Sequence, residues 1–274
     1  MAVFNPPGIG REVRASYAFV ERNLNLAKRY WGWEIAFFLY TISSSLSVIY
    51  IGEAQDPAGR GELVLTLGIG TLVWAYLRSV FDSISEMITW ERWEGTIEYT
   101  FMAPISRLTH MLGTALFSIV YGILRTAALF VALALFVDLD LSRTNYGAAF
   151  VVTLVGSLSF LGIGIMASIL PLWFTERGAE MTFMISAILL LISGVYYPIS
   201  VLPDWLEPLA RLSPATYFLD GIRRTVISGQ GLSQLGDVLL PLLVMGMLSI
   251  PLGVWVFLRV ETYAKRTGRL KRNG

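Results

Sequence analysis

"TNYGAAFVVTLVGSLSFLGIGIMASILPLWFT", residues 144–175, contains no charged side chain. A helix needs about 20 mostly apolar residues to cross a hydrocarbon core about 30 Å thick, and this run is longer than that. The composition of the whole chain agrees, since 55% of its 274 residues are hydrophobic and only 15% are charged. A soluble domain carries about a quarter charged residues. The sequence therefore predicts an integral membrane protein built from helices.

Six runs in all are long and apolar enough to be considered as spans. In chain order they cover about 33–52, 63–88, 108–136, 146–174, 180–197 and 237–258. The fifth is short and ends at a Tyr-Tyr-Pro sequence, and the sixth contains Pro241 and Pro251, which membrane helices tolerate. We expect an all-α fold with six transmembrane helices in a single domain, residues 1–274.

Several classes of function are excluded by composition. The chain has no cysteine and one histidine, which excludes disulfides, thiolate nucleophiles and Cys-based or His-cluster metal sites. Its net charge of +1 does not favour nucleic acid or an acidic partner. The first residues lack the basic-then-apolar pattern of a signal peptide, so we expect the N-terminus to be retained.

The distribution of Lys and Arg predicts the orientation. Basic residues concentrate before the first span, between the second and third spans, and in the tail 259–274. Because cytoplasmic segments carry an excess of Lys and Arg, both termini are expected in the cytoplasm. The segments 53–61, 138–145 and 199–236 are then expected outside. The membrane would be a bacterial or archaeal cell membrane.

Two further segments are expected to lie on the membrane. Residues 11–31 place an apolar stripe along one face of a helix: Val13, Tyr17, Val20, Leu24, Ala27 and Trp31. This pattern predicts a basic interfacial helix, and a purely structural anchor is the plainer alternative. Residues 199–236 are read as two short re-entrant helices, broken at Pro203 and Pro214.

The segment "ERWEGTIEYTFMAPISR", residues 91–107, is charged and aromatic between two apolar runs. Read as one helix over 90–103, it has an apolar face of Trp93, Ile97 and Phe101. Its acidic face is formed by Glu91, Glu94 and Glu98. Like charges at this spacing favour a basic partner. Pro104 disfavours helix at the residue before it, and Gly95 suggests close approach by another surface. The alternative is an amphipathic loop lying flat on lipid.

The longer stretch "ERWEGTIEYTFMAPISRLTHMLG", residues 91–113, resembles the segment after the second span of type 2 permeases of ATP-binding-cassette (ABC) exporters. That family has an acidic-x-x-Glu-Gly-Thr-hydrophobic-Glu run followed by a Pro-hydrophobic-Ser step. "ISGVYYPISVLPDWLEPLARLSPATYFLDGIRRTVISG", residues 192–229, resembles the family's stretch from the fifth span to its extracellular re-entrant helices. The order of the spans agrees as well, so the resemblance covers most of the chain.

The resemblance implies an exporter's membrane subunit, a homodimer with two separate ABC ATPase subunits bound beneath it. ATP and Mg would belong to those subunits, since this chain has no phosphate loop and would not itself be an enzyme. The helix at 91–103 would be a coupling helix that docks on the ATPase. Its expected coupling residues are Glu91, Trp93, Glu94, Gly95, Thr96, Glu98 and Phe101. Residues 99–101 depart from the Leu-rich sequence of many members.

"GIGIMA", residues 162–167, superficially fits a dinucleotide-binding fingerprint. It lies inside a membrane span with no strand before it. We therefore predict that its small residues serve helix packing.

Charged residues at membrane depth are the remaining site candidates. Arg78 and Asp82 are spaced to form an intrahelical ion pair, with Glu86 near the cytoplasmic interface. Arg125 is too far from either end of its span to reach the interface easily. Two alternatives remain open for it, a substrate path or a buried pair with Asp82 or Glu86.

The substrate is expected to be a drug-like or lipid-like amphiphile, because the spans are apolar and the expected exit carries three aromatic residues. With Arg125, the substrate-path residues would be Tyr196, Tyr197 and Trp205. Polysaccharide or glycolipid export is the runner-up, since aromatic rings also stack on sugars. A membrane-embedded lipid-processing enzyme is less favoured, because the acidic residues are scattered. A receptor or scaffold without transport is a third alternative.

Overall fold

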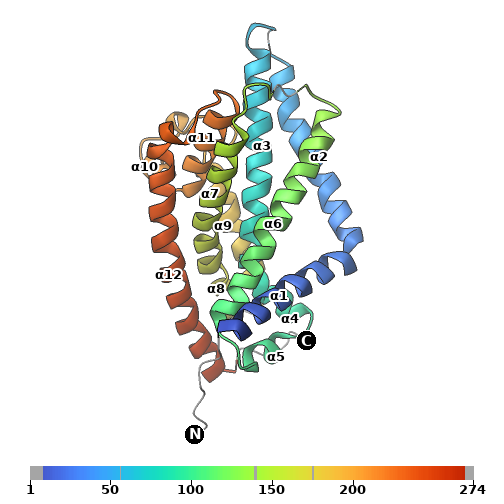
Figure 1. Ribbon diagram of the computed structural model, residues 1–274, viewed down its shortest axis with the longest axis vertical. Coiled ribbons are helices and arrows are strands. Elements are labelled where there is room, and N and C mark those ends of the chain that lie inside the picture. The colour runs from blue at the N-terminus through green and yellow to red at the C-terminus, as the bar shows by residue number, and fades with distance from the viewer. Residues whose placement is uncertain (1–8, 56, 139–140, 175, 269–274) are drawn as a thin grey trace.

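The computed structural model describes residues 9–55, 57–138, 141–174 and 176–268. These residues form a bundle of helices with no strand among them (Figure 1). The α-helices are α1 (Ile9–Arg29), α2 (Trp31–Glu53), α3 (Pro57–Ser85), α4 (Met87–Trp93), α5 (Ile97–Met102), α6 (Arg107–Ala134), α7 (Tyr146–Ala167), α8 (Ile169–Trp173), α9 (Gly178–Ile192), α10 (Glu207–Arg211), α11 (Pro214–Val226) and α12 (Gly236–Arg266). Two short 3₁₀ turns, η1 (Ile199–Val201) and η2 (Leu232–Gln234), complete the described part.

Five helices of the described chain are long and apolar enough to cross a membrane. They are Trp31–Glu53, Gly59–Ser85, Arg107–Ala134, Tyr146–Trp173 and Gly236–Arg266. These correspond to five of the six predicted spans, and the all-α membrane fold is confirmed. The remaining prediction, 180–197, corresponds to α9, an apolar helix of only 15 residues.

The early end of α9 has a physical reason in the chain that follows it. Gly194 adopts a positive φ of 68°, which turns the backbone out of the helix. From α11, the Arg223 guanidinium then donates to the Gly194 carbonyl at 3.2 Å and to the Val195 carbonyl at 2.8 Å. Those carbonyls would otherwise lack partners beyond the helix end. The bundle above α9 is thus filled by α11 instead of a longer fifth span.

The first residues of the predicted basic tail, 259–274, are helical. Helix α12 continues to Arg266, past the expected span end at 258. Its extension is stabilised by Glu261, which pairs with Lys265 at 2.7 Å and with Arg107 at 2.8 Å. Residues 269–274, the end of the predicted tail, lie outside the described residues.

The main core lies where α3, α7, α11 and α12 pack together. Close contact depends on small residues of α7. A side chain at Gly162 would collide with Ser249 of α12, and one at Gly164 would meet Ile84 of α3 at 3.0 Å. The prediction that this glycine-rich sequence serves helix packing is therefore confirmed. A smaller apolar cluster joins α2, α3 and α6.

The short segment between α3 and α6 departs from the prediction of one helix over 91–103. Gly95 has a φ of 72°, in the left-handed region that an α-helix cannot contain. The Thr96 amide donates to Glu91 O at 2.9 Å and the Gly95 amide to Arg92 O at 3.1 Å. These two bonds form a Schellman motif, with glycine at the position that requires positive φ.

The prediction of a single helix is wrong, because this turn separates α4 from α5. The left-handed turn, and not only close approach by a neighbour, accounts for the glycine. The predicted stop is confirmed, since α5 ends at Met102 and Ala103 before Pro104 is extended.

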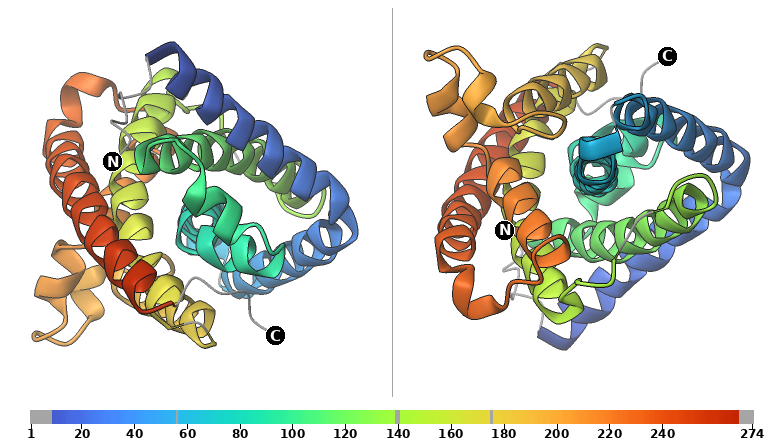
Figure 2. Two further views of the ribbon diagram at one scale, coloured as in Figure 1. Left: turned by 90° about the horizontal axis from the view of Figure 1, so that it is seen from below. Right: turned by 90° about the horizontal axis from the view of Figure 1, so that it is seen from above.

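The two described ends of the chain lie at the same end of the bundle as α4 and α5. Glu12 of α1 contacts Ser106 just before α6, and Glu261 near the end of α12 contacts Arg107. Seen from below, α1 crosses the bundle beside α4 and α5, whereas the view from above shows α10 at the edge of the bundle (Figure 2). Helices α10 and α11 lie at the opposite end from α4 and α5 (Figure 1).

Candidate functional site

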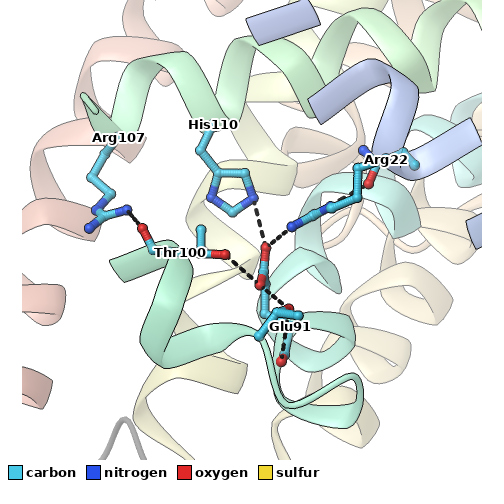
Figure 3. Close-up of polar contacts among 7 residues, drawn as sticks. Arg22, Glu91, Thr100, Arg107 and His110 are labelled. Carbon is cyan, nitrogen blue, oxygen red and sulfur yellow. Dashed lines mark hydrogen bonds and ion pairs between the residues drawn. The ribbon is translucent and has the colours of Figure 1, made fainter. Parts of the chain in front are cut away.

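A buried carboxylate joins the α4–α5 segment to two other helices. Glu91 of α4 is 1% exposed and forms an ion pair with Arg22 of α1. His110 Nε2, from α6, lies 3.4 Å from Glu91 Oε1. Figure 3 shows the arginine and the histidine converging on this carboxylate from two helices.

The other carboxylate oxygen binds α5 and the turn before it. Thr96 Oγ1 donates to Glu91 Oε2 at 2.5 Å, and Thr100 Oγ1 donates to the same oxygen at 2.8 Å. We call Arg22, Glu91, Thr96, Thr100 and His110 the Glu91 cluster. It connects α1, α4, α5 and α6 through one side chain.

The Glu91 carboxylate is held in its charged form. Burial alone would raise its pKa, but the Arg22 charge and the hydrogen bonds from Thr96 and Arg22 lower the pKa of Glu91 below its ordinary value. A buried ion pair contributes to stability only when its remaining lone pairs are satisfied, and here the threonines satisfy them.

A second attachment ties α5 to α6 and α12. Arg107 Nη1 donates to the Thr100 carbonyl at 2.8 Å, and Nη2 donates to the Phe101 carbonyl at 2.6 Å. Its Nε donates to Glu261 at 2.8 Å. One arginine therefore caps the last carbonyls of α5 and holds them to the end of α12.

A third attachment lies at the turn after α4. Tyr30 Oη donates to Glu94 Oε1 at 2.7 Å, and Arg29 Nη1 lies 3.3 Å from Glu94 Oε2. The ring of Tyr30 also packs 5.0 Å from the ring of Trp93. The junction between α1 and α2 is thereby fixed to the α4–α5 segment.

The outer side of the segment is exposed and apolar. We call Trp93, Glu98, Tyr99 and Met102 the exposed α4–α5 surface. The exposed fractions of Trp93, Tyr99 and Met102 are 57%, 79% and 85%. Glu98 is exposed among them. This surface lies at the end of the bundle, where a partner can reach it (Figure 1).

The predicted coupling residues thus separate into three groups by exposure. Glu91 and Phe101 are buried, and Glu94, Gly95 and Thr96 are only partly exposed. Trp93 and Glu98 face outward. The predicted acidic face of three glutamates does not exist, because Glu91 turns into the protein to meet Arg22.

The predicted ion pair within α3 is formed by Arg78 Nε and Asp82 Oδ2, which lie 3.3 Å apart. For Arg125, neither expected partner was right. Its Nη1 lies 3.5 Å from Glu34 Oε2 of α2, and Tyr121 Oη donates to the same oxygen at 2.9 Å.

The four predicted substrate-path residues do not lie together. Arg125 lines a cavity between α1, α2, α3 and α6, and the described residues lining it include none of the other three. Tyr196 packs on the main core, and Tyr197 donates its hydroxyl to Leu191 O at 2.6 Å. Trp205 is 72% exposed, beside α10.

Sequence reasoning missed the roles of Arg22, Glu34, Arg107 and His110. One signal was available, because the repeated glutamates indicated a need for a basic partner. Nothing in the local sequence identifies that partner as Arg22, which is 69 residues from Glu91.

Comparison with known proteins supports this architecture. No curated protein matches the chain. A family model described as ABC-2 type transporter matches residues 17–227, from within α1 to the end of α11. The match covers most of the chain and includes the Glu91 cluster, the first resemblance region and all but the last two residues of the second. The chain therefore belongs to the ABC-2 type transporter family and is a multi-pass membrane permease subunit of an ABC transporter.

Proposed function

We propose that this permease exports a drug-like or lipid-like amphiphile, driven by a separate ABC ATPase that docks on the exposed α4–α5 surface. The observation that carries the proposal is the combination of that surface with the Glu91 cluster behind it. An exposed aromatic and methionine surface is typical of a protein interface. The same segment is bonded to α1 and α6, and through Arg107 of α6 it is connected to α12.

The three attachments give a physical route by which a movement of the α4–α5 segment would reach the membrane helices. A displacement of α4 and α5 by the ATPase would move Glu91 against Arg22 and His110, and would move the end of α5 against Arg107. Because ion pairs and hydrogen bonds hold these contacts, α1, α6 and the end of α12 would shift with the segment. ATP and Mg would be bound by the ATPase subunits, of which we propose two copies per permease homodimer.

The same proposal sets the orientation of the permease in the membrane. The ATPase is cytoplasmic, so the α4–α5 end and both chain termini would face the cytoplasm of a bacterial or archaeal cell. Val13 and Tyr17 of α1 are 65% and 67% exposed, so the apolar stripe of α1 is free to contact lipid. Helices α10 and α11 would then lie at the outer face.

The proposal is tested by reversing one charge on the docking surface. Glu98 forms no ion pair with a described residue, so Glu98→Arg should leave the permease folded. We expect co-purification of the ABC ATPase with the tagged permease to weaken by about tenfold, equivalent to about 1.4 kcal/mol. ATP-dependent export should fall with it.

Glu62→Arg is the matched control, because Glu62 is an exposed acid at the start of α3. It should leave ATPase association unchanged. If Glu98→Arg and Tyr99→Ala both bind the ATPase as the native chain does, the docking surface lies elsewhere. If no ABC ATPase associates with the native chain, the proposed function is wrong.

A further inference from the structure

A cavity of about 220 Å³ with a mixed polar and apolar lining lies between α1, α2, α3, α4 and α6. The residues that matter here are Tyr30, Glu34, Glu86, Trp90, Phe117 and Tyr121. Ligand pockets for whole drug-sized molecules have volumes of about 300–1,000 Å³. The size of this cavity therefore suits a head group better than an entire amphiphile.

The charges around the cavity are balanced except for one carboxylate. Arg22 pairs with Glu91, and Arg125 lies 3.5 Å from Glu34. Asp82 pairs with Arg78 at 3.3 Å.

Glu86 is the exception. It is partly buried in the turn between α3 and α4, and no described residue forms a hydrogen bond or an ion pair with its carboxylate. A half-buried, unpaired carboxylate is costly unless a cation approaches it. Burial and the nearby Asp82 raise the pKa of Glu86 to about 7, and a cation in the cavity would hold this carboxylate in its charged form. The cavity thus presents one carboxylate without a partner among the described residues.

Aromatic rings form two sides of the same cavity. The rings of Tyr30 and Trp90 lie 6.2 Å apart, and those of Phe117 and Tyr121 stack at 5.1 Å. The face of an aromatic ring attracts a cation, and several such rings around one site favour quaternary ammonium groups. Both the charge and the rings therefore select for an organic cation.

Exposed apolar side chains lie on α2 close to Glu34, which lines the cavity. Trp33 directly precedes Glu34 and Phe37 follows it by three residues, and their exposed fractions are 65% and 58%. A hydrocarbon chain attached to a head group in the cavity could lie on this surface, within the lipid. A small, fully soluble cation would gain nothing from it.

We propose that this cavity binds the ammonium group of a cationic amphiphile, with Glu86 as its counter-ion and the four rings as its walls. The inference rests on the proposed transport function, because it names the chemical class of the substrate. Glu34 and Arg125 position Tyr121 and keep the cavity free of a second net charge.

The test is direct binding to the purified full chain in an uncharged maltoside detergent, without ATPase. Radiolabelled dodecyltrimethylammonium is the probe, and dodecyl sulfate is the chain-matched anion. We expect saturable binding of the cation, no competition by dodecyl sulfate, and a loss of affinity of at least about tenfold in Glu86→Gln. Phe117→Leu, which removes a ring without a charge, should also weaken binding.

Glu62→Gln, near the opposite end of α3 from Glu86, is the matched control and should bind as the native chain does. Choline, which has the head group but no chain, should compete poorly. Equal competition by choline would overturn the assignment to an amphiphile. Unchanged affinity in both Glu86→Gln and Phe117→Leu, with native size-exclusion profiles, would overturn the site itself. Because no ATPase is present, this experiment tests the cavity separately from the proposed function. The cation can fail to bind while the ATPase still docks, and the cation can bind even if the chain does not transport it.

Discussion

The two ends of the bundle use arginine in different ways. At the α4–α5 end, Arg22 and Arg107 pair with the carboxylates of Glu91 and Glu261, which lie on other helices. At the α10–α11 end, Arg223 donates mainly to the backbone carbonyls that follow α9. The arginine pairs at the first end join residues 69 and 154 positions apart in the sequence. Those at the other end are more local, since Arg223 contacts carbonyls no more than 29 residues away and Arg224 pairs with Asp237, 13 residues away.

This difference between the two ends affects how far the helices at each end can move relative to one another. Side-chain ion pairs can keep their contact while two helices slide, because both partners have long flexible stems. A guanidinium bonded to two successive carbonyls holds the local backbone in one conformation, as Arg223 does after α9 and Arg107 does at the end of α5. The long-range pairs of Arg22 and Arg107 then connect α4 and α5 to other helices. The comparison predicts that the α4–α5 end transmits movement and that the α10–α11 end serves as a fixed frame.

The largest expected effect comes from removing the centre of the Glu91 cluster. Glu91→Leu leaves Arg22 without its ion pair and two threonine hydroxyls without their acceptor. We expect the free energy of unfolding to fall by about 3 kcal/mol. The apparent melting temperature in detergent should drop, and association with the ATPase should weaken as well.

Glu91→Gln is the control for this change, since an amide keeps an acceptor for the threonines but loses the charge. Its loss of stability should be smaller. A Glu91→Leu variant with native melting temperature and native ATPase association would contradict the transmitting role of this end.

A somewhat smaller effect is expected at the other end. Arg223→Met removes the donor for the Gly194 and Val195 carbonyls, at a cost of about 2 kcal/mol. The melting temperature should fall, but ATPase association should stay native in the folded fraction. Arg211→Met is the control, because the Arg211 side chain is 68% exposed and its pair with Glu207 contributes little. Loss of ATPase association in Arg223→Met would remove the distinction between the two ends.

The smallest expected effect concerns the turn between α4 and α5. Gly95→Ala forces a left-handed conformation on a residue with a Cβ atom, at a cost of about 1 kcal/mol. Gly32→Ala on α2 is the control, and we expect it to raise the stability instead of lowering it. Nothing lies within 4 Å of a side chain added there, so alanine should stabilise the helix by about 0.5–1 kcal/mol. Equal melting temperatures for the two variants would mean that α4 and α5 can merge into one helix.

Hydropathy was sufficient to predict the five long helices, because each apolar run exceeds the bilayer core. It placed the end of the fifth span at 197, whereas α9 ends at Ile192, because that end depends on Arg223 from a segment some thirty residues later. No local pattern reports such a contact. The Pro104 stop was predictable because proline restricts its neighbour directly.

The site was predictable in position but not in geometry. The acidic run marked the α4–α5 segment, yet periodicity treated 91–103 as one uninterrupted helix. The left-handed φ of Gly95 breaks that periodicity and turns Glu91 inward. The pair of Arg125 and Glu34 was also not predictable from local sequence, because it depends on how α2 packs against α6.

The short length of α9 has a consequence for the bilayer around it. A 15-residue helix spans only about 22 Å, well below the hydrocarbon thickness of about 30 Å. Its exposed face is apolar, with Phe183, Ile188 and Leu191 turned outward. Lipids in contact with this face must therefore shorten or tilt, which lowers the local membrane thickness. We expect head groups and water to reach deepest into the outer leaflet beside α9.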